Sequence, residues 1–291
     1  MITVELVDAF TDGGVGGNVA GVVSEGAAAL SPAQRQQIAH QVGVSETAFV
    51  LPSETADYKL EFYTPTRAIP HCGHATVGTF ARLAALGRLQ GAELVNETVD
   101  GPRRIRLQDG RAFLEQVPAR LTRLDESTTR EILESLGISK AHLLANGGPF
   151  LADNGNRSIL LGLVDTNVLR SIRPDLDRVL DISNRFDAVC YYVFSLSSVA
   201  PGRDATARMF GPAYGIPEES ATGMAAGPLA CWLDANTAGS RDGFSIQQGH
   251  LMSPASPSLI IARPERSGGT LSSMWVGGSA QLRGMRRVSL V

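Results

Sequence analysis

A glycine junction that turns a strand into a helix constrains this chain more than any other feature, and it occurs twice. The first junction is Pro70–Thr79, in which Cys72 precedes Gly73 and His74 follows it. The second is Glu218–Ala225, which also leads into an apolar, alanine-rich stretch. Each junction would place unpaired N–H groups at a helix N-terminus, where the helix dipole attracts an anion. Two such junctions indicate a duplicated fold with a site between its halves.

The residue pattern after each junction predicts an apolar helix, over residues 74–86 and 222–235. Both stretches have almost no polar face, so we expect both helices to be buried. Gly73 is expected to permit the tight backbone turn that starts the first helix. Elsewhere the pattern predicts surface helices at 33–41 and 127–136, short strands within 94–117, and further strands at 2–9, 19–23, 44–51, 58–64, 158–164, 188–195, 259–263, 274–278 and 286–291.

The bulk composition is that of a folded protein with two domains of ordinary size, since 291 residues are 43% hydrophobic and 19% charged. We place the halves at 1–118 and 119–278, with a C-terminal strand at 279–291 that can return to the first half. A net charge of −3 without a dense basic run argues against nucleic acid as a partner. The lack of a signal peptide or of an apolar run near ~20 residues predicts no membrane partner. Three widely spaced cysteines fit a reducing cytoplasm, so we expect a cytoplasmic protein.

Glu46 is the first candidate for chemistry, because it shares a strand face with Val44, Ala48 and Val50. A carboxylate among apolar side chains is costly unless it gains a partner or holds its proton more tightly, and a general base uses such an environment. The alternative is a Glu46 that lies at a frayed strand end in water.

The residues of the first junction leave several roles open. His74 could donate to a substrate or relay a proton, or it could cap its own helix. Cys72 could be a reactive thiol activated by the helix dipole, or a small buried residue. Cys72, His71 and His74 also suggest a metal site, but residues this close rarely face one ion, so no metal is expected. The glycine-rich stretch Asp12–Asn18 leads from strand to strand instead of into a helix, which argues against a dinucleotide site.

Taken together, these segments resemble the phenazine-biosynthesis isomerase family, the PhzF-like proteins with the diaminopimelate epimerase fold. The matching segments follow in order along the chain: Val7–Thr11, Gly17–Asn18, Ser45–Phe49, Tyr63–Pro65, Cys72–Thr76, Arg208–Pro212, Gly215–Ile216, Glu218, Ala221–Gly223, Gly227–Leu229, Gln248–Gly249 and Val276–Gly278. The resemblance implies an α+β fold of two similar halves, each a curved, mainly antiparallel sheet around a central helix, with the active site in the cleft between them. It also implies a homodimer that uses neither a metal nor an organic cofactor.

The resemblance also assigns roles to residues. It implies that Glu46 is the general acid and base, assisted by His74 and by Glu219. In the best understood member, the matching glutamate moves a proton between carbons of dihydro-3-hydroxyanthranilate. A small anionic, amino-acid-like substrate would rest its carboxylate on the junction amides, so the expected substrate-binding residues are Asn18, Gly73, Ala75, Thr76, Thr222, Gly223 and Met224.

The chain departs from the family pattern at several positions. The usual assisting aspartate is Glu219, a substrate-binding serine is Met224, and the proline after the Gly-Asn pair is Val19. The base is kept while the polar lining changes, so we expect a cofactor-independent isomerase whose substrate differs from the phenazine precursor. Two other functions stay open. One is a racemase or epimerase that uses Cys72, with Ser220 near the place of the second cysteine; the other is a non-catalytic interaction protein on the same scaffold.

Overall fold

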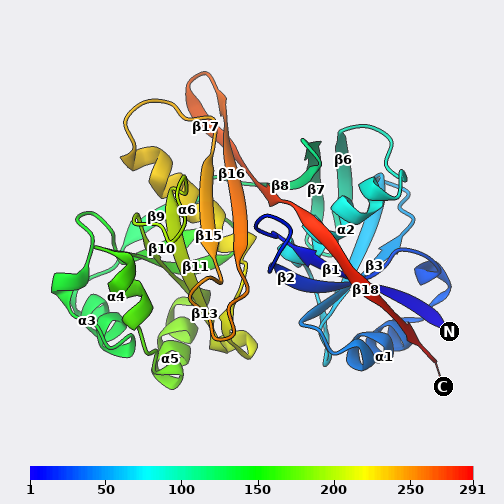
Figure 1. Cartoon of the computed structure of the whole chain (residues 1–291), viewed down its shortest axis with the longest axis horizontal. Coiled ribbons are helices and arrows are strands. Elements are labelled where there is room, and N and C mark those ends of the chain that lie inside the picture. Colours follow the sequence, from blue (N-terminus) through cyan, green and yellow to red (C-terminus); the bar gives the residue numbers. More distant parts are fainter. Residues whose placement is uncertain (291) are drawn as a thin grey trace. The chain divides into compact units, whose positions relative to one another are not determined.

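The computed structural model describes residues 1–290, which form two compact units (Figure 1). Unit 1 comprises Met1–Glu115 and the described chain from Gly277 onward, and unit 2 comprises Gln116–Val276. Strand β18 (Ala280–Val288) pairs antiparallel with β1 (Ile2–Ala9), so the C-terminal segment lies in the sheet of unit 1. The last residue of the strand expected at 286–291 lies outside the described residues.

Unit 1 contains a mainly antiparallel sheet. Its remaining strands are β2 (Asn18–Val23), β3 (Glu46–Leu51), β4 (Tyr58–Tyr63), β5 (Ala68–Ile69), β6 (Glu93–Thr98), β7 (Gly101–Gln108) and β8 (Arg111–Gln116). Their hydrogen-bonded order is β18-β1-β2-β3-β4-β6-β7-β8, with β5 beside β4. The pairs β2–β3 and β4–β6 are parallel, and the other pairs in this series are antiparallel.

The two longer helices of unit 1 begin within one residue of their predicted starts. The short 3-10 helix η1 (Ala27–Ala29) precedes α1 (Pro32–Val42). The Ser31 side chain accepts the Gln34 N–H, the Gln34 side chain accepts the Ser31 N–H, and Gly43 ends α1 in the left-handed region at φ 66°. Helix α2 (Gly73–Ala85) follows the first junction and contacts β1, β2, β3 and β18. Residues 74–80 are all buried, so the expected central helix is confirmed.

Unit 2 contains a second mixed sheet. Its strands are β9 (Arg120–Arg123), β10 (Phe150–Asp153), β11 (Arg157–Leu163), β12 (Ala188–Ser195), β13 (Ala205–Gly211), β14 (Ile216–Glu219), β15 (Phe244–Gln248), β16 (Ser258–Ser267) and β17 (Thr270–Gly278). The order is β9-β10-β11-β12-β13-β15-β16, with β14 beside β13. The pairs β11–β12 and β13–β15 are parallel.

The two units share one strand topology. The series β1-β2-β3-β4-β6-β7 and β10-β11-β12-β13-β15-β16 both alternate antiparallel, parallel, antiparallel, parallel and antiparallel. The central helix also enters at the same point, because α2 follows β5 and α6 (Gly223–Asn236) follows β14. Helix α6 is almost entirely buried and contacts β9, β11, β15 and β16. The expected α+β fold of two similar halves, each with a central helix, is therefore confirmed.

The surface helices of unit 2 are more extensive than the sequence predicts. Helix α3 (Glu126–Ser135) lies within one residue of its predicted bounds, but α4 (Thr166–Ser171) and α5 (Leu176–Phe186) were not predicted. Figure 1 shows α3, α4 and α5 grouped on one side of the unit, where they cover an apolar core that includes Ile159 and Tyr191. The short 3-10 helices are η2 (Lys140–His142) and η3 (Pro212–Tyr214). None of the described helices combines the length and the apolar character that a membrane span needs.

Candidate active site

The buried imidazole of His74, in the first junction, faces a buried carboxylate that comes from β3. Glu46 opens β3 and pairs with Ala20 of β2, and its residue exposure is 8% against 5% for His74. Glu46 Oε2 lies 3.3 Å from His74 Nε2. Neither atom has a hydrogen-bond partner among the described residues. Because buried polar atoms are normally partnered, this pair is suited to receive a polar group of a ligand.

The opposite ring nitrogen of His74 faces two further side chains. Its Nδ1 lies 3.3 Å from Asn18 Nδ2 and 3.4 Å from Cys72 Sγ. Glu46, Cys72 and His74 each have one possible metal-ligand atom, and these three atoms lie within 4.8 Å of one another. The sequence suggested Cys72, His74 and His71 as the group of possible ligands, so Glu46 replaces His71 in that group. Glu46 and Cys72 nevertheless approach opposite nitrogens of one ring, which a tetrahedral metal site does not allow without rearrangement. The arrangement fits proton transfer better.

The start of α2 offers backbone donors beside this pair. Cys72 is the N-cap residue and makes no side-chain capping bond. The N–H groups of Gly73, His74 and Ala75 therefore have no intrahelical partner, as at any uncapped helix start. Thr76 differs, because its N–H and its Oγ1 both donate to the Cys72 carbonyl, at 3.0 and 2.7 Å. Thr76 thereby closes the first turn of the helix, and its expected contact with an anion stays a prediction.

The reason for a glycine at position 73 also differs from the expectation. Gly73 is not among the glycines with a positive φ, so the turn does not require its conformational freedom. A Cβ built on Gly73 would meet nothing within 4 Å. The missing side chain instead leaves open space next to the first-turn amides, which allows a ligand to approach the backbone closely.

Two neighbours of the site residues carry further unpartnered polar atoms. Ser45 Oγ and His71 Nδ1 are buried and have no hydrogen-bond partner among the described residues. Burial, with a smaller contribution from the positive charge of Arg103, lowers the pKa of His71 to about 4. The Phe62 ring meets the His71 ring edge-on with centroids 5.8 Å apart. His71 is therefore a neutral imidazole at ordinary pH.

The second junction is organised around Gln248, the last residue of β15. Gln248 Oε1 accepts from the Thr222 N–H at 3.1 Å and from the Tyr192 hydroxyl at 3.0 Å. Gln248 Nε2 donates to the Glu219 carbonyl at 2.7 Å and to Thr222 Oγ1 at 3.1 Å. Thr222 Oγ1 in turn donates to Glu219 Oε2 at 2.8 Å. Burial raises the pKa of Tyr192 well above its usual value, so its hydroxyl stays a donor.

This network uses the polar groups of the second junction to different extents. The N–H and the hydroxyl of Thr222 are both used inside the network, and its expected role in substrate binding stays a prediction. Gly223 and Met224 open α6 and supply its first-turn amides. Glu218 forms a two-point pair with Arg208, with both N–O distances at 2.8 Å, and lies in β14. The sequence gives Gln248 no role beyond a family motif, although a polar residue that ends an apolar strand is a usable signal.

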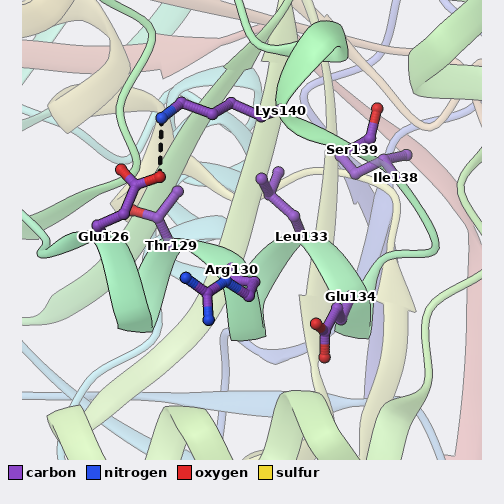
Figure 2. Close-up of a pocket in the computed structure, with 8 residues that line it drawn as sticks. All are labelled: Glu126, Thr129, Arg130, Leu133, Glu134, Ile138, Ser139 and Lys140. Atoms are coloured by element: carbon purple, nitrogen blue, oxygen red, sulfur yellow. Dashed lines mark hydrogen bonds and ion pairs between the residues drawn. The ribbon is translucent and has the colours of Figure 1, made fainter.

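A surface pocket of about 280 Å³ lies apart from both junctions in sequence, between α3 and η2 (Figure 2). Figure 2 shows the Lys140 ammonium directed at the Glu126 carboxylate, and the two are 2.7 Å apart. Its lining residues are Glu126, Thr129, Arg130, Leu133, Glu134, Ile138, Ser139 and Lys140. No histidine or cysteine is among these eight, and the Lys140 and Glu126 charges satisfy each other, so we assign this pocket no catalytic role.

The duplicated fold carries a buried carboxylate–imidazole pair beside a helix N-terminus, an arrangement suited to acid–base chemistry. The family model described as phenazine biosynthesis-like protein, PhzC-PhzF, matches residues 7–282, and the chain belongs to that family. It is 36% identical over 286 residues to an uncharacterized isomerase of Deinococcus radiodurans, covering 94% of this chain and 90% of that one. It is 32% identical over 280 residues to the trans-2,3-dihydro-3-hydroxyanthranilate isomerase of Pseudomonas chlororaphis, covering 94% of both.

A solved structure agrees with this family membership. The PhzF-family phenazine biosynthesis protein of Bacillus anthracis matches with a TM-score of 0.87 and 25% identity over 99% of both chains. The expected family and enzyme class are confirmed: the chain is an isomerase of the PhzF type.

Proposed function

We propose that this isomerase moves a proton between two carbons of a small carboxylate or amino-acid-like substrate, with Glu46 as the proton carrier. The observation that supports this most directly is the buried Glu46–His74 pair, whose facing atoms lie 3.3 Å apart and have no hydrogen-bond partner among the described residues. A general base must be able to reach the proton it removes, and an unpartnered carboxylate oxygen meets that requirement.

In the proposed reaction, the Glu46 carboxylate removes a proton from a substrate carbon. The electron pair of the broken C–H bond enters the π system of the substrate. The protonated Glu46 then returns the proton to a second carbon, so the reaction is a net rearrangement without oxidation or reduction. The substrate carboxylate rests on the first-turn amides of Gly73, His74 and Ala75, where the helix dipole favours an anion.

Residues of the second junction have a supporting role in this proposal. We include the roles that the family pattern gives to Glu219, as an assisting group, and to Gly223 and Met224, as ligand-binding residues at the start of α6. Thr222 Oγ1 donates to Glu219 Oε2, which fixes the position of the Glu219 side chain. Since Met224 stands where the family has a serine, the substrate differs from the phenazine precursor in the group that this position contacts.

The test is solvent deuterium exchange followed by proton NMR. The protein is incubated in D₂O with trans-2,3-dihydro-3-hydroxyanthranilate, with small unsaturated carboxylates and with free amino acids. For the compound that rearranges, Glu46→Gln should lower turnover by about 10²–10⁴-fold, because it keeps the shape and removes the base. Glu219→Gln should cost less, and the exposed Glu54→Gln is the matched control that should change nothing.

Two results would overturn the proposal. One is a Glu46→Gln variant that turns over as fast as the wild type. The other is deuterium that enters only the α-carbon of a free amino acid and disappears in Cys72→Ala, which would establish the racemase alternative. Full activity in Cys72→Ala with loss in Glu46→Gln would support the isomerase.

A further inference from the structure

We infer that Asn18 is a positioning residue that sets the protonation of His74, so that His74 carries its ring proton on Nε2 and Glu46 is the proton acceptor of the pair. The consequence for catalysis rests on the proposed function, but the protonation of the ring does not.

The inference starts from the donor inventory around His74. The Nδ2 atom of an asparagine amide is a donor only, and it lies 3.3 Å from His74 Nδ1 in a buried contact. A donor facing Nδ1 requires a lone pair on that nitrogen. A neutral imidazole that accepts at Nδ1 must hold its proton at Nε2.

Cys72 supports the same assignment. Its Sγ lies 3.4 Å from the same Nδ1, and a thiol can donate its proton there. Two groups that can donate therefore face Nδ1. On the other side of the ring, Glu46 Oε2 lies 3.3 Å from Nε2, and the oxygens of an ionised carboxylate can only accept. Each neighbour thus favours a proton on Nε2 and none on Nδ1.

The backbone explains why Asn18 can hold this position. Asn18 is the first residue of β2 and pairs with Ala9, and its neighbour Gly17 has a φ of 90°. A Cβ on Gly17 would lie 2.7 Å from the Ala9 carbonyl, so only glycine fits directly before Asn18. The side chain of Asn18 is 7% exposed, which restricts its motion. A tight, glycine-dependent strand start therefore presents a fixed amide to the imidazole.

The chemical consequence is a division of roles. With its proton on Nε2, His74 offers a hydrogen-bond donor to the substrate and cannot accept a proton at that atom. Glu46 is then the group that removes the proton from carbon. A wrong tautomer in a comparable acid–base pair costs about 10⁴-fold in turnover, so the orientation of one amide can have a large effect.

The experiment is nitrogen NMR of the full chain with ¹⁵N-labelled histidine, at a pH of about 8, where an ordinary histidine is neutral. His74→Gln assigns the His74 signals among the five histidines. In the wild type, Nε2 should show the protonated and Nδ1 the unprotonated chemical shift. No substrate is needed, so this outcome is independent of whether the proposed reaction is correct.

Variants then reverse or remove the contact. Asn18→Asp presents only acceptors to Nδ1 and should place a proton on Nδ1, with a fall of about 10²–10⁴-fold in kcat once the substrate is known. Asn18→Ala should give a mixture of tautomers, and the exposed Asn156→Asp controls for the added charge. A protonated Nδ1 in the wild type would overturn the inference even if Asn18→Asp fails to fold. An unchanged tautomer in a folded Asn18→Asp would overturn it as well.

Discussion

The two glycine junctions occupy the same place in two copies of one topology, but they differ in whether their buried polar atoms have hydrogen-bond partners. At the first junction, Glu46 Oε2 and His74 Nε2 are buried without hydrogen-bond partners among the described residues. At the second junction, Gln248 binds two donors and two acceptors, and it ties Glu219 to Thr222. Unpartnered buried atoms are costly and a satisfied network is rigid. The comparison shows buried polar atoms without hydrogen-bond partners beside the first junction and a connected hydrogen-bond network at the second.

Among the stability changes predicted here, Gln248→Ala should cause the largest fall in the free energy of unfolding. The substitution leaves the buried Tyr192 hydroxyl and the Thr222 amide without their acceptor, and each such loss costs ~1–3 kcal/mol. We expect the free energy of unfolding to fall by about 3 kcal/mol in urea titrations. Gln41→Ala, which removes an exposed hydrogen bond of α1, is the control and should have little effect. A Gln248→Ala variant as stable as the wild type would remove the contrast between the junctions.

The loss of stability in acid tests the first junction, through its buried residue His71. Its folded pKa of about 4 lies below the value of 6.5 expected for an unfolded histidine. The unfolded chain therefore binds more protons between these values, and the free energy of unfolding falls as the pH decreases through that window. The full difference corresponds to about 3 kcal/mol.

Replacement of His71 by glutamine removes this contribution. Urea unfolding of His71→Gln and of the wild type, at pH about 7 and about 4.5, should show a smaller acid-induced loss in the variant. Equal losses in the two proteins would mean that His71 is protonated in the folded state without penalty, and that the first junction tolerates charge better than we infer.

The smallest expected effect is that of Gly73→Ala. A methyl group there meets no atom within 4 Å, and the backbone does not need glycine, so stability should stay within about 0.5 kcal/mol. Substrate binding should weaken, with KM rising about tenfold, because the methyl group fills the space beside the first-turn amides. Gly78→Ala, on the same helix, would place its Cβ 3.4 Å from Val7 Cγ1 and should leave KM unchanged. A normal KM in Gly73→Ala would argue that no ligand approaches these amides.

Local signals were sufficient for much of the secondary structure. The bounds of strands β1 and β12 agree with the prediction. Both segments have 8 residues, and alternating or continuous apolar residues over that length are typical of strands. Helix α1 is delimited by Ser31, Pro32 and Gly43, whose capping roles need no tertiary contact. Helix α5 was missed although Asp175 caps it and Val179 and Ile182 lie on its buried face. That amphipathic pattern is a local signal that the sequence already contains.

Contacts between distant residues were decided only by the tertiary structure. Glu46 lies on β3, which pairs parallel with β2, and it is buried in the folded chain. The sequence alone allowed either a buried or a hydrated carboxylate at this position. Asn18 and His74 are 56 residues apart, and Thr222 and Gln248 are 26 apart, so no local spacing relates them. The sequence by itself determined the capped helices and the apolar strand segments, because capping residues and apolar periodicity are local signals. The folded chain determined which polar atoms are satisfied, because that depends on which strands become neighbours.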